Sequence, residues 1–464
     1  MAAILIPPLP GWGPHVITYA VNGVQASFTI NVVEAPSLVV TTNADVANPF
    51  DRFTSLREAL AYATTLSGPQ TITFAPGLAG QTVTLASGWN GPDDTSALLV
   101  LNQVSIVGPV TAPGITVAMA PGVLMRHLLV EDSGNLTLAQ LTFTNGYSAD
   151  YGGSIESFGA LTISNCTFVG NFAQDLGGAI HSEIGSASLV IENSTITGNT
   201  ASDFAGVIGS GSSQTHFQNV TITGNKCPYA LSLYANTATM VNSILAGNNN
   251  DGVLAYGTAA FSTQSVNNLI GTGGSAGLVN GVNNNQVGLS TASLHLGALA
   301  NNGGPTPTIA LLPGSPAINA GIVISGRTTD QRGLPIGAAP DIGAFEYVAP
   351  TIITTPTNVT FLGGIMEQLY LDGDRRAGPN LLCRRSIAPR REFHLPGDVE
   401  RLPCVRVCGD LPVDGARFAW RATYGDPIPY PHRRGPRSPT QLQHQWPGLG
   451  SQRRYVQWRS EHLH

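Results

Sequence analysis

The stretch LTISNCTFVGN at residues 161–171 decides the fold, because close variants of it return along the chain. The variants read LTLAQLTFTNG at 136–146, LVIENSTITGN at 189–199, THFQNVTITGN at 215–225 and ATMVNSILAGN at 238–248. The equivalent positions 141, 166, 194, 220, 243 and 268 are separated by 25, 28, 26, 23 and 25 residues. A repeat of this length indicates a solenoid, in which each unit buries its apolar face only against its neighbours.

Apolar and polar residues alternate within each unit, as Leu161, Ile163 and Phe168 show. Alternation is typical of β-strands, whereas a helix repeats its apolar residues every three to four positions. Two short strands, a bend and a glycine-rich segment make one rung of a parallel β-helix. We therefore predict an all-β solenoid whose rungs stack at about 4.8 Å, the spacing of neighbouring strands.

Asparagines recur at the bend of every unit. They are Asn165, Asn193, Asn219, Asn242 and Asn267, with Gln140 in the first unit. Asparagine tolerates left-handed backbone geometry, and stacked amides can hydrogen-bond to one another. We predict a structural ladder of amides along this row; the alternative is a polar row that binds a ligand. A second row contains Asn171, Asn199, Asn225 and Asn248.

Aspartates begin a third recurring element, which reads DYGGSI, DLGGAI and DFAGVI in three successive units. They are Asp150, Asp175 and Asp203. Carboxylates one rung apart repel one another unless they are solvated, protonated or bridged by a cation, so these three are candidate Ca²⁺ ligands. We nevertheless expect solvated turns with no metal or other cofactor, because the glycines of this element fit a tight turn.

The charge of the chain changes abruptly along its length. Residues 371–464 hold 16 of the 22 basic residues and nine of the 28 acidic ones, which leaves six basic and 19 acidic residues before them. This end has no alternation and many prolines, so we predict a linker and a disordered tail over 349–464. Its arginines would suit a nucleic-acid-binding arm. The lack of lysine in it favours an out-of-frame tail instead, and we predict no nucleic-acid partner.

The first 36 residues carry a hairpin pattern. Alternating apolar residues flank Asn22-Gly23, a typical two-residue turn. Two strands cannot sustain a domain, so we interpret residues 1–36 as the remnant of an immunoglobulin-like module. No lysine or arginine precedes Arg52, so the charged start of a signal peptide is missing, and we interpret Met1 as a truncated start. No apolar run approaches the roughly 20 residues of a transmembrane helix.

Residues 38–63, LVVTTNADVANPFDRFTSLREALAYA, resemble the SLREA segment that begins the β-helix of bacterial secreted and outer-membrane proteins. The usual first cysteine of that segment is Thr54 here. Ser55 and Glu58 have the spacing of a helix capping box. The apolar face of this helix would consist of Leu56, Ala59, Leu60 and Ala63. Such a helix would close the first rung, which otherwise exposes strand edges and core.

Residues 294–321 and 329–347, LHLGALANNGGPTPTIALLPGSPAINAG and TDQRGLPIGAAPDIGAFEY, resemble the carboxy-terminal cap of choice-of-anchor Q proteins. These belong to the polymorphic outer-membrane and pectate-lyase-like β-helix superfamily. The resemblance implies a right-handed parallel β-helix over 37–290, a cap over 291–348 and a variable anchor, of which no sign is visible. For Asp330, Arg332, Asp341 and Glu346 we predict an ion-paired network that pins the cap onto the last rung.

Catalysis on a β-helix has demands that this repeat meets poorly. Pectate-lyase chemistry needs clustered acids that hold Ca²⁺ and a basic residue near the substrate, and Lys226 is the only lysine or arginine in 135–271. Inverting hydrolysis needs two carboxylates about 6.5–9.5 Å apart. The candidate catalytic residues are Asp150, Asp175, Asp203, His181 and Lys226, with Glu183 beside them. We predict a noncatalytic protein; the alternative is a polysaccharide lyase or glycoside hydrolase.

Cysteines add little to this prediction. Cys166 takes an inward position and Cys227 lies two rungs later, too far for a disulfide at about 4.8 Å per rung. Cys383, Cys404 and Cys408 fit no zinc spacing. We expect a secreted or cell-surface protein, extracellular or on a bacterial outer membrane, that is adhesive or structural. Its expected partners are glycans or components of cell surfaces and matrix.

Overall fold

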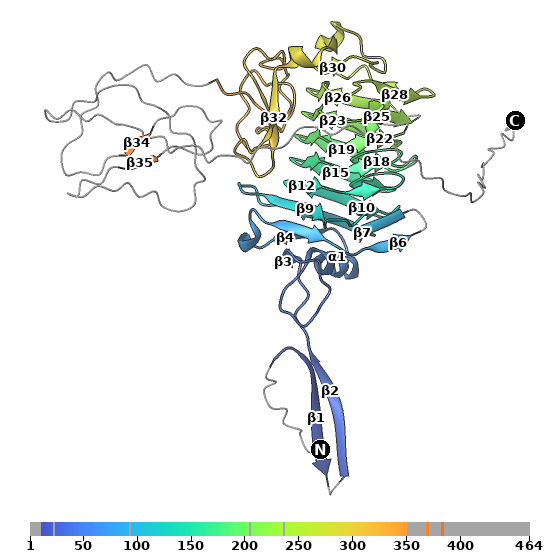
Figure 1. Cartoon of the computed structure of the whole chain (residues 1–464), viewed down its shortest axis with the longest axis vertical. Coiled ribbons are helices and arrows are strands. Elements are labelled where there is room, and N and C mark those ends of the chain that lie inside the picture. The colour runs from blue at the N-terminus through green and yellow to red at the C-terminus, as the bar shows by residue number, and fades with distance from the viewer. Residues whose placement is uncertain are drawn as a thin grey trace, which may run out of the picture. The chain divides into compact units, whose positions relative to one another are not determined.

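The computed structural model describes residues 11–21, 24–91, 94–203, 206–234, 237–349, 368–370 and 382–384. All of them belong to one compact unit, residues 1–389. The described chain is mostly β, and from residue 39 onward its strands coil into a parallel β-solenoid (Figure 1). The predicted all-β solenoid is therefore confirmed.

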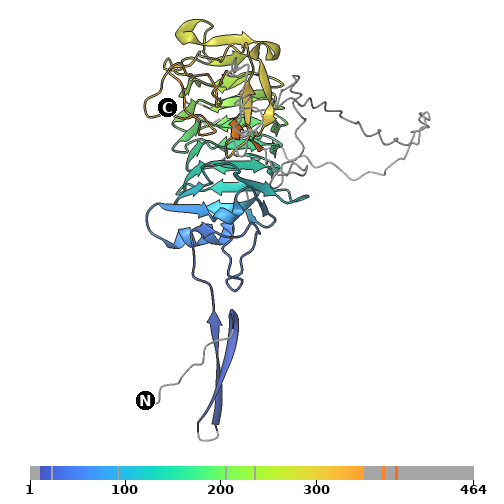
Figure 2. The ribbon, with the colours of Figure 1, turned by 90° about the vertical axis from the view of Figure 1, so that its left-hand side faces the viewer.

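Three long sheets form the walls of the solenoid (Figure 2). Sheet I contains β6 (Trp89–Gly91), β7 (Asp94–Val100), β10 (Arg126–Val130), β14 (Ile155–Ser157), β18 (Ile180–Ser182), β22 (Gly206–Ser210), β25 (Tyr229–Tyr234) and β28 (Val253–Tyr256). Sheet II contains β3 (Val39–Val40), β4 (Gln70–Phe74), β8 (Gln103–Val107), β11 (Asn135–Ala139), β15 (Ala160–Ser164), β19 (Leu189–Glu192), β23 (Thr215–Gln218), β26 (Thr237–Val241) and β29 (Ala260–Phe261).

Sheet III contains β5 (Thr82–Leu85), β9 (Ile115–Met119), β12 (Leu141–Thr144), β16 (Thr167–Val169), β20 (Thr195–Thr197), β24 (Thr221–Thr223), β27 (Ile244–Leu245), β30 (Leu269–Gly271) and β31 (Gln286–Leu289). A short fourth sheet contains β13 (Tyr147–Ser148), β17 (Phe172–Ala173) and β21 (Thr200–Ala201). Each strand pairs in parallel with its equivalent one repeat away, apart from β6 and β7, which are antiparallel.

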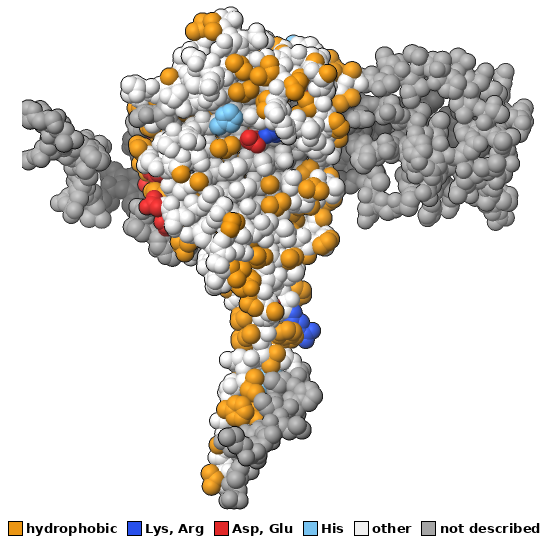
Figure 3. Space-filling model, turned by 180° about the vertical axis from the view of Figure 1, so that it is seen from behind, with side chains coloured by type: hydrophobic (Ala, Val, Ile, Leu, Met, Phe, Trp, Pro, Cys, Tyr) orange, Lys and Arg blue, Asp and Glu red, His pale blue; other side chains and the backbone are white. Residues whose placement is uncertain are grey.

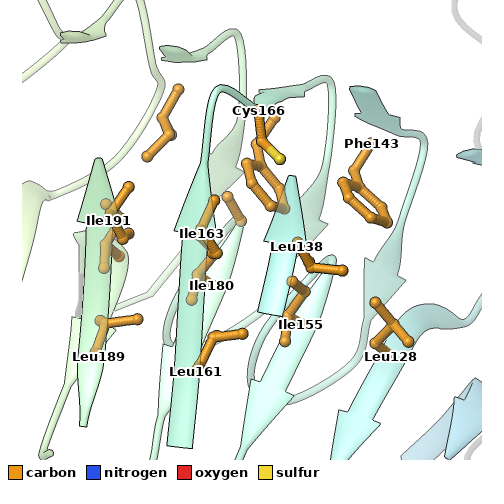
Figure 4. Close-up of a cluster of buried hydrophobic side chains, with 14 of the residues drawn as sticks. Leu128, Leu138, Phe143, Ile155, Leu161, Ile163, Cys166, Ile180, Leu189 and Ile191 are labelled. Atoms are coloured by element: carbon orange, nitrogen blue, oxygen red, sulfur yellow. The ribbon is translucent and has the colours of Figure 1, made fainter. Parts of the chain in front are cut away.

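The core fills the space between the sheets with equivalent side chains in register. Leu161 pairs with Leu189, and Ile163 pairs with Ile191 (Figure 4). The rings of Phe143 and Phe168 stack with centroids 5.1 Å apart. Each buried aliphatic or aromatic side chain contributes about 1.5–3 kcal/mol of hydrophobic stabilisation. Cys166 lies in this core as a free thiol, as its position predicted, and burial raises the pKa of its thiol to about 12.

The helix α1 (Leu56–Thr65) covers the first rung (Figure 1). Ser55 is its N-cap, and the predicted capping box with Glu58 is formed. The predicted apolar face is buried, and it comprises Leu56, Ala59, Leu60 and Ala63. Sequence and structure therefore agree on how the chain begins its solenoid.

Several short elements complete the described chain. The predicted hairpin is formed by β1 (Gly13–Val21) and β2 (Val24–Val32), which pair antiparallel, while its turn residues lie outside the described residues. Three 3₁₀ turns are η1 (Pro76–Leu78), η2 (Val282–Asn284) and η3 (Thr291–Leu294). None of the helices in the described ranges is long and apolar enough to cross a membrane. The arginine-rich tail lies outside the description apart from the pair β34 (Gln368–Tyr370) and β35 (Leu382–Arg384).

The C-terminal segment, residues 291–348, does not sit where we predicted. We expected it to close the last rung, but with its hairpin β32 (Leu296–Ala300) and β33 (Thr308–Leu311) it extends along the side of sheet III. The cause is an apolar outer face on the late strands of that sheet. Ile244 and Leu269 form a second hydrophobic cluster with Ile342 and other apolar residues of the segment.

The bend asparagines bind this segment, which corrects the prediction of an amide ladder among them. They adopt the left-handed backbone that we expected, with φ between 44° and 56°. The amides of all but Asn165, however, donate to carbonyls of the segment, because an irregular chain has backbone carbonyls without sheet partners. The bonds join Asn193 to Thr329 (2.9 Å), Asn219 to Gly343 (3.4 Å), Asn242 to Ile322 (2.8 Å) and Asn267 to Ala320 (2.7 Å).

The second row of asparagines does form a buried ladder. Each amide nitrogen donates to the amide oxygen one rung further on, from Asn171 to Asn199 (2.9 Å), Asn199 to Asn225 (3.1 Å) and Asn225 to Asn248 (2.9 Å). The same oxygens accept the backbone N–H groups of the preceding rung. This row therefore satisfies backbone groups at a corner where the sheets do not.

Candidate functional site

The candidate site lies on the outer face of sheet I. Ile155 and Ile180 are in register and point into the core (Figure 4). Because side chains alternate along a strand, the following residues, Glu156 and His181, take the opposite face and lie opposite each other. Glu183 occupies the same face two residues further along the chain from His181.

The imidazole of His181 lies between two carboxylates. Its Nδ1 is 3.9 Å from Oε1 of Glu156 and 3.9 Å from Oε1 of Glu183. One potential ligand atom from each of the three residues lies within 4.8 Å of the other two. His181 Nδ1 is buried and has no hydrogen-bond partner among the described residues. No other described group brings three histidine, cysteine or acidic side chains this close together.

Arg126, on the neighbouring strand β10, pairs with Glu156. Its Nη1 forms an ion pair with Oε2 of Glu156 at 2.9 Å. The guanidinium is itself fully buried and donates to the carbonyl of Tyr151 and to the hydroxyls of Ser96 and Ser148. A buried pair of this kind costs desolvation free energy, which these additional hydrogen bonds offset.

Two neighbours border the ring of His181. The ring of Tyr151 lies over it, with centroids 4.9 Å apart and planes tilted by 32°. On the next rung stands Gly209, where a Cβ atom would approach Cδ2 of His181 to 2.7 Å. Any larger residue there would displace the imidazole. Burial, and next the charge of Asp150, raise the pKa of the Tyr151 hydroxyl.

The predicted aspartate row borders this site. Asp175 donates its backbone N–H to the carbonyl of Asp150 (3.1 Å), and Asp203 accepts from Nε2 of Gln174 (3.2 Å). Burial raises the pKa of Asp175, the charge of Asp203 raises it further, and His181 opposes both. The row thus lies in register as predicted, yet it belongs to no cluster of three potential ligands among the described residues.

Lys226 stands apart from these acids. Its backbone pairs with Thr200, and its side chain is exposed and forms no ion pair with a described residue. The structure therefore brings His181 together with Glu183, and sets both beside the aspartate row, without Lys226.

Two tyrosines extend the same face along the solenoid. Tyr234 of β25 pairs in register with Tyr256 of β28, and their rings stack at 4.8 Å with an angle of 13°. The register of the neighbouring strands places Glu183 in the same row, two rungs before Tyr234. Tyr256 is 42% exposed, so the row ends in an accessible aromatic surface.

Of the four residues for which we predicted an ion-paired network, Arg332 and Asp330 form an ion pair, while the carboxylates of Asp341 and Glu346 accept backbone N–H groups of the same segment. Arg332 donates to Oδ2 of Asp330 (2.6 Å) and to the carbonyl of Glu346 (2.6 Å). Oε2 of Glu346 accepts from the backbone of Asp341 (3.1 Å). The segment is tied to the rungs by a separate ion pair, Arg327 with Glu192 (2.7 Å).

The sequence carried a signal for Glu156 that we did not use. When DYGGSIES is aligned with DLGGAIHS, Glu156 falls opposite His181, and DFAGVIGS adds Gly209. The contribution of Arg126 had no such signal, because it comes from an earlier rung outside the repeat.

Comparison with known proteins gives one finding. Residues 126–292 match a family model described as a right handed beta helix region. No curated protein matches the chain. The match contains all of the site residues Arg126, Glu156, His181 and Glu183, and together with the sheet topology it identifies the scaffold that presents them as a right-handed parallel β-helix.

Proposed function

We propose that this chain is a noncatalytic secreted or cell-surface protein that binds glycans through the outer face of sheet I. The observation that carries the proposal is the stacked pair Tyr234 and Tyr256, in one row with Glu183. On the face that Figure 3 shows, charged side chains are sparse, and most of the described surface is polar and uncharged or hydrophobic.

Aromatic rings and carboxylates together suit a sugar. The C–H faces of a pyranose ring pack on aromatic side chains, and carboxylate oxygens accept hydrogen bonds from its hydroxyls. A straight sheet offers both kinds of group along one line. This arrangement favours an extended polysaccharide over a compact ligand.

The setting of this function rests on the resemblances in the sequence. The SLREA segment and the segment at 294–347 support membership of the choice-of-anchor Q group and an adhesive or structural role outside the cell or on an outer membrane. Components of a cell surface or matrix are the other partners that these resemblances support.

A glycan array with a matched pair of variants tests the proposal. Tyr256→Ala removes an exposed ring from the row, and Tyr62→Ala removes a half-buried ring from α1, away from this face. We expect wild-type protein and Tyr62→Ala to bind the same polysaccharides, and Tyr256→Ala to bind them at least tenfold more weakly. Equal binding by both variants, or no binding by wild-type protein, would refute the proposed face.

A polysaccharide lyase or glycoside hydrolase is the second candidate, because buried Glu156 and His181 form an acid–imidazole cluster with half-buried Glu183. The geometry favours it less. Oε1 of each carboxylate lies 3.9 Å from the same imidazole nitrogen, so both acids face His181, whereas a glycosidase places its two acids on either side of the scissile bond. Arg126 is enclosed and cannot reach a substrate proton. Reducing sugar or unsaturated product formed by wild-type protein but not by Glu183→Gln would select the enzyme.

A further inference from the structure

We propose that Glu156, His181 and Glu183 bind one divalent transition-metal ion of the Zn²⁺ type. This inference goes beyond glycan binding and does not depend on it. The three residues come from β14, β18 and the residue that follows β18, so that the rigid sheet sets their spacing.

The donor atoms already surround a common point. His181 Nδ1 lies 3.9 Å from an oxygen of each carboxylate, and the third side of the triangle is at most 4.8 Å. The centre of such a triangle is about 2.5 Å or less from each corner, and Zn²⁺ binds nitrogen and oxygen at about 2.0–2.2 Å. A shift of each carboxylate oxygen by a few tenths of an ångström toward this centre would bring it to bonding distance of the ion.

The histidine supplies an observation independent of the acids. Its side chain is 4% exposed, and Nδ1 is buried, aimed at both carboxylates and without a hydrogen-bond partner among the described residues. A buried polar atom without a partner costs free energy, which a bound ion would recover. Tyr151 lies over the ring, and Gly209 leaves room for it at a position where a Cβ atom would approach Cδ2 to 2.7 Å.

The local charge favours a cation. Glu156, Glu183, Asp150 and Asp175 all lie around the ring of Tyr151, and Arg126 is the cation that pairs with Glu156. When the imidazole is neutral, the four carboxylates carry more negative charge than the single guanidinium balances. A divalent ion would reduce the repulsion, and Arg126 would orient Glu156 as residues behind metal ligands do.

The ligand set indicates which ion binds. Imidazole together with carboxylates suits Zn²⁺ and neighbouring first-row metals, whereas Ca²⁺ and Mg²⁺ prefer sites made of oxygen alone. The competing occupant is a proton, which would convert His181 into an imidazolium between the two carboxylates. A direct measurement of metal binding separates the two.

The experiment is calorimetric titration of the full chain, freed of metal by a chelator, with ZnCl₂, MnCl₂ and CaCl₂. The test variants are Glu183→Gln and His181→Gln. The controls are Asp203→Asn, which removes a nearby charge, and His216→Gln, which removes an imidazole from sheet II. The remaining histidines and cysteines of the chain are common to all the variants, so any ion that they bind contributes equally to each titration.

We expect Zn²⁺ to bind wild-type protein and both controls, with at least a tenfold weaker affinity in Glu183→Gln and His181→Gln. The thermal midpoint should rise with Zn²⁺ only where the site is intact. Unchanged Zn²⁺ binding in both test variants, or no Zn²⁺ binding by folded wild-type protein, would overturn the proposal. Tighter binding of Ca²⁺ than of Zn²⁺ at these residues would overturn the assigned class of ion.

Discussion

Replacing Asn199 by alanine should destabilise the solenoid far more than removing the side chain of Asn165. Oδ1 of Asn199 accepts from N and Nδ2 of Asn171 at 3.0 and 2.9 Å, and Nδ2 donates to the carbonyls of Phe168 and Thr197 at 2.9 and 3.1 Å and to Asn225. Alanine would leave the buried backbone N–H of Asn171 without its acceptor, at about 1–3 kcal/mol, and would remove the other bonds at about 1 kcal/mol each. Partial relaxation reduces the total to about 3–5 kcal/mol.

Asn165 provides the contrast. It has a φ of 52°, and its Oδ1 is buried without a partner among the described residues. Glycine accepts that backbone conformation, so Asn165→Gly should change the stability by about 1 kcal/mol or less. The two variants thus remove amides from two rows of the same repeat with opposite expectations.

Urea unfolding followed by circular dichroism measures both variants, and hydrogen exchange of the Asn171 amide gives a local reading. We expect a large shift of the midpoint and faster exchange in Asn199→Ala alone. If Asn165→Gly lowered the free energy of unfolding as much as Asn199→Ala, the conclusion that the second row of asparagines provides the stabilising hydrogen bonds would be wrong. The bend amide would then stabilise the fold although its oxygen has no partner among the described residues.

Three further predictions concern core, acid and metal. Ile196 is fully buried between Phe168 and Ile222, so Ile196→Asp should cost several kcal/mol and lower the thermal midpoint, while Val190→Asp on the outer side of β19 should change little. Burial lowers the pKa of His127 from 6.5 to about 4. The neutral imidazole therefore makes its full contribution to stability above pH 6.5, and the free energy of unfolding falls by up to about 3 kcal/mol as the pH falls to 4. Melting measured as a function of pH should show a weaker dependence over this range in His127→Gln. Ca²⁺ should leave the thermal midpoint of the metal-free protein unchanged, because the aspartate row forms no ligand cluster; a saturable rise that Asp175→Asn abolishes would contradict this.

The repeat predicted the rungs because every unit carries the same local instructions. Leu161 and Ile163 alternate as a strand, Asn165 marks a left-handed bend, and Ser55 with Glu58 starts the covering helix. Each of these preferences acts within a few residues, so a single sequence reveals them.

The packing of the C-terminal segment against the side of the solenoid could not be predicted in the same way. Asn193 and its partner Thr329 are 136 residues apart, and Gln331 reaches the carbonyl of Cys166 across 165 residues. The candidate site is an intermediate case. The pairing of Glu156 with His181 follows from aligning two repeats, but Tyr151 reaches His181 through a turn whose direction only the folded chain defines.

The C-terminal segment gives this solenoid a fixed length. A stack of equivalent rungs can ordinarily gain or lose a repeat during evolution, because each unit contacts only its neighbours. Here one segment is hydrogen-bonded to four successive bends by Asn193, Asn219, Asn242 and Asn267. Deletion or duplication of a rung would move some of these asparagines along the solenoid by one rung spacing and leave the others where they are, so that not all of the hydrogen bonds could form. The segment therefore acts as a ruler, and changes in the number of rungs require matching changes in a stretch of sequence that lies beyond the repeats.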